Sequence, residues 1–455
     1  MPAVVADEAV RRAFARDSSG LERIPDAVAR PDSVGEIQEL LRNAFSEGTA
    51  VTPAGAQTSY VASSITDQGI LLSLRALDRV IDVDPSRRIA RVQPGVILGD
   101  LKRELAKDGL LFAPDPTSED ECTLGGAIAA NASGARSLKY GATRRHVRGL
   151  TVLLADGQTL VVRRSSVEKN TAGFQPLQDL VDWFVGSEGT LGVIVEAELD
   201  LLPLPAAVIG FGFPFPAAAD AFRFIAQARE SGSVSPRCLE YLDERAFAIA
   251  REALGQNSWS PGAGAFVYAE QENDGQSEPV IDAWHAIADS CGVRADDVRV
   301  FSSEPELREA RRMRHAVPST LNARAAAHWK DGGRKVSTDW AVPYRRLGEA
   351  LDLSAAIAER HGLEAPYTFG HAGNGHPHQN YIARNADQLR TVESVLRETL
   401  EGVIALGGTI SAEHGVGKLK KHWLPLQLSP LQLALMRSIK SVFDPRGILA
   451  PGNLL

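Results

Sequence analysis

The chain has 455 residues, of which 44% are hydrophobic and 23% charged, a balance typical of a globular protein with two or three domains. Its net charge of −8 argues against nucleic acid as the main partner, because phosphate binding needs a concentrated basic surface. No apolar run reaches the roughly 18–20 residues of a membrane span. The first residues lack a secretory apolar core and include Asp7 and Glu8, so we expect a cytoplasmic protein, at most peripheral to the inner membrane.

The chain contains three cysteines, Cys122, Cys238 and Cys291, and none forms a C-x-x-C pair. This excludes a cysteine-ligated iron–sulfur cluster or a cysteine zinc site within the chain. If the protein handles electrons, we expect them to leave to an acceptor outside this chain.

Residues 1–21 are expected to form a short helical lead and residues 22–205 a first domain of mixed helices and strands. A helix is predicted over residues 33–48, because helical apolar spacing runs from a Ser33 cap to Gly48. Strands are expected at residues 69–74, 88–92 and 149–154, and a hairpin at residues 151–162 around Asp156-Gly157.

The residue composition of the sequence changes near Pro203-Leu204-Pro205. Residues 206–300 then alternate strand-like runs and amphipathic helices, which predicts a second domain of α+β type. Residues 441–455 are rich in turn residues and are expected to form a compact end.

Three segments of the first domain are dense in small residues: 53–60, 114–141 and 186–194. A backbone without bulky side chains can approach a ligand closely, and its N–H groups can cradle phosphate. The G-x-G-x-x-G fingerprint is absent from the sequence. A dinucleotide would therefore need an architecture other than the Rossmann type.

Histidines cluster late in the chain. His371, His376 and His378 fall within eight residues, and His414 follows Glu413. Imidazoles, one carboxylate and an open position are the ligand set of a catalytic Zn²⁺, Mn²⁺ or Fe²⁺ site. In an extended strand His376 and His378 would share a face, so these two could be the ligand pair. The residues alone leave the ligand set open.

Two basic segments, residues 307–315 and 334–343, precede this cluster. We interpret Arg308, Arg311 and Arg312 as a solvated helix face. A guanidinium fork matches both oxygens of a carboxylate, so the remaining cations could hold an anionic substrate.

Together these motifs resemble the vanillyl-alcohol-oxidase/PCMH flavoproteins, specifically the branch of D-lactate dehydrogenase, D-2-hydroxyglutarate dehydrogenase and the glycolate oxidase large subunit. The resemblance covers nearly the whole chain and is carried by DAVARPDSVGEIQELL, PDPTSEDECTLGGAIAANASGARSLKYG, GSEGTLGVI, GHAGNGHPHQN, SAEHGVGKLKK and FDPRGILAPGNLL. It implies an α+β fold with a PCMH-type FAD-binding domain of two subdomains at 22–205. A substrate (cap) domain with a metal site would follow at 206–440, and residues 441–455 would return to pack on the FAD domain.

The resemblance implies one FAD per chain. The loop at residues 53–60 contains neither His nor Cys, which argues against covalent attachment, and it is poorer in glycine than the family loop. The implied FAD-binding residues are Ala54, Gly55, Ala56, Gln57, Thr58, Ser59, Pro116, Ser118, Gly125, Gly126, Ser133, Gly134, Gly189, Ile194 and Asn453.

The histidine segment resembles the family motif G-H-x-G-D-G-N-x-H, which implies that His371, His378 and Glu413 hold a divalent metal. Zinc is expected first, with manganese or iron as alternatives. His376 stands where the motif has Asn, and its role stays open. The resemblance further implies His414 as the proton acceptor, and Arg314 and Lys335 as holders of the substrate carboxylate.

The implied activity is FAD-dependent oxidation of a small D-2-hydroxy acid, D-lactate first, to the 2-oxo acid, with hydride transfer to the flavin N5. The missing nicotinamide fingerprint implies an external acceptor other than NAD: a quinone, a cytochrome, an electron-transfer flavoprotein or an iron–sulfur subunit. A homodimer is one expected assembly.

The alternatives to D-lactate oxidation are D-2-hydroxyglutarate or glycolate as substrate, a flavin-dependent ether-lipid synthase that performs alkyl transfer, and a non-catalytic subunit. A single histidine after Glu413 argues against the synthase, and the histidine cluster argues against the non-catalytic subunit.

Overall fold

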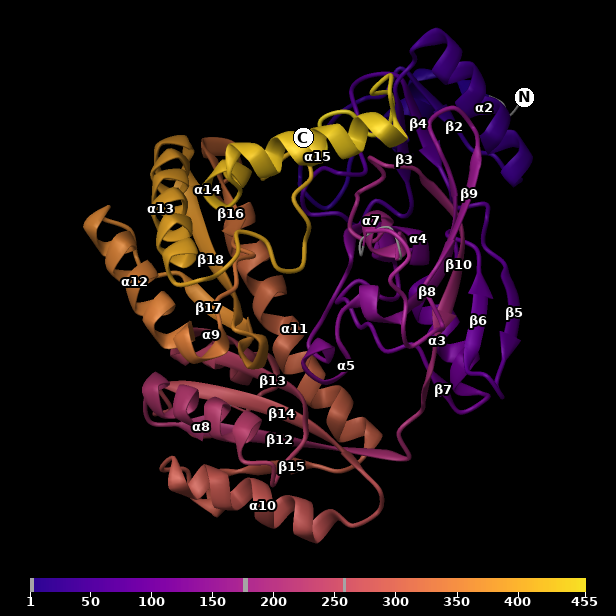
Figure 1. Ribbon diagram of the computed structural model, residues 1–455. Helices are drawn as coiled ribbons and strands as arrows, with labels where there is room; N and C mark the ends of the chain where they lie inside the picture. Colours follow the sequence, from indigo (N-terminus) through magenta and orange to yellow (C-terminus); the bar gives the residue numbers. More distant parts are fainter. Residues whose placement is uncertain (1–3, 175–178, 257–258) are drawn as a thin grey trace. The chain divides into compact units, whose positions relative to one another are not determined.

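The computed structural model describes residues 4–174, 179–256 and 259–455 (Figure 1). Residues 1–3 of the expected helical lead lie outside this range. The chain forms two units. Unit 1 comprises residues up to Gly134, Tyr140–Leu204 and Glu413–Leu455, and unit 2 comprises Ala135–Lys139 and Pro205–Ala412. The chain thus rejoins unit 1 at Glu413, earlier than the residue 441 expected from the sequence.

Unit 1 contains two main sheets. The first has the order β1-β2-β4-β3, with β1 antiparallel to β2 and the other neighbours parallel. The second has the order β5-β6-β10-β8-β9 and is antiparallel throughout. The strands are β1 (Val4–Val5), β2 (Ala27–Ala29), β3 (Val51–Ala54), β4 (Ile70–Ser73), β5 (Val80–Asp84), β6 (Ile89–Val92), β8 (Val147–Leu153), β9 (Thr159–Arg163) and β10 (Val193–Asp200), with a separate pair β7 (Leu110–Leu111) and β11 (Leu202–Pro203).

The helices of unit 1 are α1 (Glu8–Ala13), α2 (Val34–Glu47), α3 (Leu98–Ala106), α4 (Leu124–Ala130), α7 (Val181–Phe184), α14 (Leu424–Gln427) and α15 (Pro430–Phe443). The predicted helix over residues 33–48 is confirmed, since the Ser33 hydroxyl accepts from the Glu36 N–H and α2 ends at Gly48 with φ 75°. The predicted hairpin is confirmed as the antiparallel pair β8–β9. The expected lead is shorter than predicted, because α1 ends at Ala13.

Unit 2 is built on one antiparallel sheet of seven strands in the order β15-β12-β14-β13-β17-β18-β16. Its strands are β12 (Ala207–Phe215), β13 (Pro236–Asp243), β14 (Ala265–Asn273), β15 (Arg299–Phe301), β16 (Gly332–Ser337), β17 (Tyr367–His371) and β18 (His376–Asn385). Its helices are α8 (Ala218–Glu230), α9 (Glu244–Ala253), α10 (Ser277–Ser290), α11 (Glu304–Ala326), α12 (Leu347–Arg360) and α13 (Ala386–Ala405), and α5 (Ser137–Tyr140) begins in the short segment that unit 2 takes from the first half of the chain.

Helices cover both faces of this sheet (Figure 1). On one face, Phe224 of α8 and Trp284 of α10 contact Phe213 of β12, with ring centroids 4.6 and 5.7 Å away. On the other face, α9 and α11 pack on β13 and β14 through an apolar cluster that includes Phe247 and Met313. The α+β class predicted from the sequence is confirmed. In the described part of the chain, no helix is both long and apolar enough to cross a membrane.

Candidate active site

Three histidines meet on the β17–β18 hairpin of unit 2. His371 ends β17, His376 begins β18 directly opposite, and His378 follows two residues later, paired with Phe369. Their ring centroids lie 4.6–5.4 Å apart, and all three side chains are buried. The tight connection of the strands, through Ala372–Asn374 and Gly375 at φ 69°, is what brings His371 and His376 together.

Glu413 follows Ala412, whose N–H donates to the carbonyl of Asp339 at 2.8 Å. Potential ligand atoms of Glu413 and of the three histidines all lie within 4.8 Å of one another. Three imidazoles and a carboxylate suit Zn²⁺, Mn²⁺ or Fe²⁺. The residues present therefore fit a divalent metal, and both ligand sets left open by the sequence are compatible with this spacing.

A buried carboxylate that the sequence analysis missed lies behind His371. The Nδ1 atom of His371 is 2.6 Å from Oε1 of Glu240, a residue of β13, and the Arg314 Nε donates to the other oxygen at 3.1 Å. Burial by itself would raise the pKa of Glu240, but His371 and Arg314 hold it at about 2. A carboxylate on one imidazole nitrogen directs the other nitrogen toward a metal.

His376 has its own acidic neighbour. Its Nε2 lies 3.2 Å from Oδ1 of Asp339, and the Ser411 hydroxyl donates to the other oxygen at 2.8 Å. Asp339 is 2% exposed, so its carboxyl group is buried beside the histidines.

The two cations expected to hold the substrate have different surroundings. Arg314 lies on α11, paired with Glu240 and with its guanidinium carbon 4.7 Å from the centroid of the Phe369 ring. Lys335 lies on β16, and partial burial lowers its pKa. Arg314 is thus part of the network that reaches His371.

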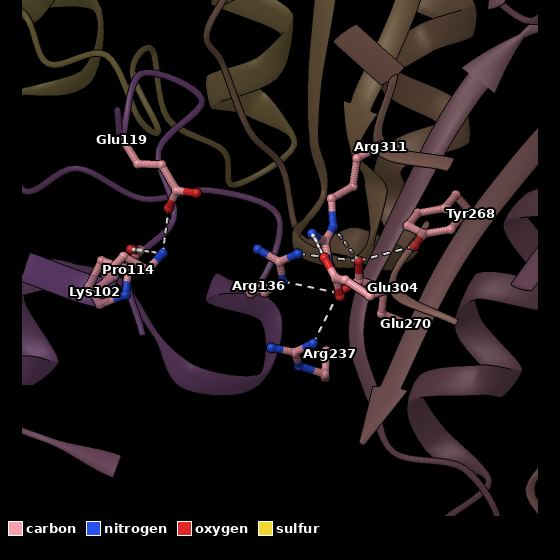
Figure 2. Close-up of polar contacts among 9 residues, drawn as sticks. All are labelled: Lys102, Pro114, Glu119, Arg136, Arg237, Tyr268, Glu270, Glu304 and Arg311. Carbon is pink, nitrogen blue, oxygen red and sulfur yellow. Dashed lines mark hydrogen bonds and ion pairs between the residues drawn. The ribbon is translucent and has the colours of Figure 1, made fainter. Parts of the chain in front are cut away.

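A second buried carboxylate, Glu270 on β14, is surrounded by arginines (Figure 2). Arg136 and Arg237 donate to it at 3.0 and 3.2 Å, the Tyr268 hydroxyl donates at 3.0 Å, and Arg311 lies 3.5 Å away. The interpretation of Arg311 as part of a solvated helix face is wrong, because its side chain is only 35% exposed and turns toward Glu270.

Two of these arginines reach Glu270 from different parts of the chain. Arg237 sits at a β-bulge between Pro236 and Cys238. The extra residue of a bulge re-aims a side chain, here toward the carboxylate. Arg136 belongs to the segment Ala135–Lys139, which lies within one of the three small-residue segments but packs with unit 2.

The segment Ala135–Lys139 also contacts the histidine hairpin. A side chain at Gly373 would have its Cβ 2.7 Å from Cδ2 of Leu138 and 3.1 Å from Cβ of Leu239, so it would displace Leu138 from its present position. Gly373 lies between His371 and His376. The position of the hairpin is therefore tied to Leu138 and, through Arg136, to Glu270.

In unit 1 the three small-residue segments come together. Gly55 lies against Thr123, and the N–H of Glu188 donates to the carbonyl of Ala129 at 2.9 Å. Gly189 lies beside Pro53. From the sequence, the glycines of these segments are expected to let the backbone approach a ligand. In the structure, several of them are also needed because two segments of the backbone pack closely together at these positions. An added Cβ would meet Thr123 at Gly55, Pro94 at Gly125 and Asp115 at Gly134, while Gly126 is more open.

The other predicted FAD-binding positions, apart from Asn453, lie in these segments. Gln57 adopts φ 58° and directs its side-chain amide to the carbonyls of Phe14 and Ser64, at 2.8 and 3.3 Å. The stretch with Pro116 and Ser118 is held by Lys102, which donates to the Pro114 carbonyl at 3.2 Å and pairs with Glu119 (Figure 2).

The C-terminal segment is hydrogen-bonded to Glu188 in one of these small-residue segments and to the nearby Ser63. Buried Glu188 accepts from the N–H groups of Val416 and Gly417 at 2.7 and 2.8 Å. Asn453 donates to the carbonyls of Ser63 and Glu188 at 2.8 and 3.1 Å. These bonds fix the loop that carries His414, whose ring lies 5.0 Å from that of Tyr60. The sequence analysis missed Glu188 as the anchor of this loop.

Two family models match the chain. Residues 25–163 match an FAD binding domain, and residues 204–454 match the C-terminal domain of FAD linked oxidases.

Among known proteins, the chain is similar to the glycolate oxidase subunit GlcD of Bacillus subtilis, with 33% identity over 95% of this chain and 89% of the relative. It is 31% identical to a D-lactate dehydrogenase of Archaeoglobus fulgidus, over 94% of this chain and 91% of the relative. A D-2-hydroxyglutarate dehydrogenase of Xanthomonas citri pv. viticola is also 31% identical, over 94% and 89%. An alkyldihydroxyacetonephosphate synthase structure matches with a TM-score of 0.73 at 20% identity, covering 98% of this chain and 83% of that one, which shows a shared fold.

Proposed function

Since the chain belongs to the FAD-linked oxidases of the vanillyl-alcohol-oxidase/PCMH superfamily, as its motifs predicted, we propose that it oxidises a small D-2-hydroxy acid to the 2-oxo acid. D-lactate is the first candidate substrate, and D-2-hydroxyglutarate and glycolate are the alternatives, because relatives at similar identity carry each of these names. The observation that carries the proposal is the buried histidine cluster with the Glu240 carboxylate behind His371.

FAD, when bound without a covalent link, supplies a hydride acceptor, and a divalent metal supplies a Lewis acid for the substrate hydroxyl. Zinc is our first candidate metal, with manganese and iron as alternatives. His371, His378 and Glu413 would hold the metal, and Glu240 would keep His371 in the tautomer that binds it.

The remaining residues would orient the substrate and move its proton. Arg314 and Lys335 would hold the carboxylate. A guanidinium has five N–H donors, so the bond from Arg314 to Glu240 leaves others for the substrate. His414, fixed by the bonds of its loop to Glu188, would accept the hydroxyl proton.

Electrons would then pass to an external acceptor other than NAD: a quinone, a cytochrome, an electron-transfer flavoprotein or an iron–sulfur subunit. Cys122, Cys238 and Cys291 are each buried and unpaired with one another, which supports an acceptor outside the chain.

The test is anaerobic stopped-flow reduction of the purified flavoprotein by D-lactate, D-2-hydroxyglutarate and glycolate, followed by turnover with a dye acceptor. We expect one of these acids to bleach the flavin rapidly, and chelation of the metal to slow the bleaching. If no 2-hydroxy acid reduces the flavin, the proposal fails. Alkyl transfer without net flavin reduction would instead identify an ether-lipid synthase.

A further inference from the structure

The ring of Tyr60 lies against the imidazole of His414, although the two residues are far apart in the sequence. Their ring centroids are 5.0 Å apart, and the ring planes are inclined to each other by 42°. Both residues belong to unit 1. Tyr60 is therefore a direct neighbour of the residue proposed as the base, and the proposed function gives it no role.

The backbone around Tyr60 is held so that its side chain stays outside the core. Val61 and Ala62, which follow it, are 1% and 0% exposed, whereas Tyr60 is 57% exposed. Gln57 and Ala62 both have φ 58°, in the left-handed region that few residues other than glycine adopt. Such conformations persist only where the surrounding structure imposes them. The loop thus holds Tyr60 in a defined place without burying its ring.

The same loop is fixed to the segment that follows His414. The Val61 carbonyl accepts from the N–H of Lys418 at 3.0 Å. At Gly417 an added Cβ would lie 2.1 Å from the same carbonyl oxygen, so the two segments pack backbone against backbone. The main chains that carry Tyr60 and His414 are therefore held at a fixed separation.

Hydrogen bonds of the main chain do not determine the rotamer of a side chain. A ring packed against the His414 imidazole excludes the rotamers in which the imidazole would occupy the place of that ring. A general base must lie within hydrogen-bond reach of the proton that it accepts, and a misplacement of about 1 Å can lower the rate on the order of 10²-fold. The orientation of His414 should therefore depend on its neighbour.

We infer that Tyr60 is a positioning residue for His414: its ring holds the imidazole in the orientation that accepts the proton of the substrate hydroxyl. The inference rests on the proposed function of His414 as the base. Because the contact is made by the two rings, the ring of Tyr60 and not its hydroxyl should matter.

The experiment is anaerobic stopped-flow reduction of the FAD-loaded protein at several concentrations of D-lactate, D-2-hydroxyglutarate and glycolate. We expect Tyr60→Ala to lower the limiting rate of flavin reduction by about 10–100-fold, while the apparent Kd of the substrate changes by less than about twofold. Tyr60→Phe, which keeps the ring, should reduce its flavin at the rate of the unmodified protein. In a protein that already carries His414→Ala, Tyr60→Ala should have no further effect, because its whole effect acts through His414.

Labelling with diethyl pyrocarbonate, followed by peptide mass spectrometry, supplies a readout that needs no substrate. Tyr60→Ala should increase the labelling of His414 several-fold relative to the exposed His422, which serves as the internal standard. Tyr60→Phe should leave this ratio unchanged.

Three results would overturn the inference while leaving His414 as the base: equal labelling of His414 in Tyr60→Ala and the unmodified protein, loss of FAD from Tyr60→Ala, or the same loss of rate from Tyr60→Ala with and without His414. Loss of FAD would show that the ring serves the FAD-binding loop instead. A normal rate in His414→Ala, or no reduction of the flavin by any of the three acids, would refute the proposed function itself, and the inference would fall with it.

Discussion

The Nδ1 atom of His371 and the Oε1 atom of Glu240 lie 2.6 Å apart, although the two residues are separated by 131 positions in the sequence. The contact arises because β13 and β17 are neighbours in the sheet, with Tyr241 opposite Gly370. Glu240 thereby connects the histidine cluster to Arg314 on α11, so that a proposed metal ligand and a proposed substrate-binding residue share one buried carboxylate.

Replacing Glu240 with Gln should weaken metal binding by about 10–100-fold, because the orientation and basicity of His371 would no longer be fixed by a carboxylate. Metal titration of chelated protein, read by a competing metallochromic dye, measures this change. Glu349→Gln is the control, since that exposed carboxylate pairs only with Arg346 among its described neighbours. Unaltered affinity in a folded Glu240→Gln protein would show that Glu240 does not act through a metal.

The two ligand sets left open by the sequence make different predictions for His376. If His371, His378 and Glu413 are the ligands, His378→Ala should lose the metal, whereas His376→Ala should retain it. If His376 and His378 are the pair, both variants should lose it. Elemental analysis of the purified variants, with FAD content as the control for folding, distinguishes the two sets. Retention of metal by His378→Ala would contradict both.

His414→Ala should slow flavin reduction by the substrate by roughly 10²–10⁴, the usual range for loss of an acid–base group. FAD and metal should stay bound, because the loop remains fixed by the bonds of Val416 and Gly417 to Glu188. Anaerobic stopped-flow absorbance measures the rate. Tyr60→Phe, which keeps a ring beside His414, is the control. A rate close to that of the unmodified protein would exclude His414 as the base.

Local signals in the sequence were sufficient for the helix ending at Gly48, the β8–β9 hairpin and the gathering of the three histidines, since each depends on residues close together in the chain. The buried carboxylates Glu240 and Glu270 could not be predicted in this way. Each lies in an apolar strand and obtains its partners only when distant strands and α11 pack together. The glycines of the small-residue segments were recognised, but the close packing that several of them serve is visible only in the structure.

The last prediction concerns pH and Glu270. Burial would raise the pKa of this carboxyl, but Arg136, Arg237 and Arg311 hold it at about 2, below its ordinary value of 4.5. A group whose pKa is lowered by folding stabilises the protein above the unfolded pKa and loses that contribution as pH falls toward the folded pKa. Glu270 should therefore contribute up to about 3 kcal/mol to the free energy of unfolding at neutral pH, and this contribution should decline from pH 4.5 toward pH 2.

Urea unfolding between pH 6 and about pH 3, followed by tryptophan fluorescence, would measure this decline. Glu270→Gln should show a shallower loss of stability with acid, while Glu304→Gln, whose carboxylate is exposed, should follow the unmodified protein. Because Glu270→Gln leaves its buried arginines without their shared carboxylate, it is expected to be destabilised at every pH.

Arg311→Met provides a second test that keeps the carboxylate. Removal of one cation should raise the pKa of Glu270 and move the loss of stability to higher pH. Superimposable pH profiles for the unmodified protein, Glu270→Gln and Arg311→Met would show that the arginine cluster does not hold Glu270 ionised.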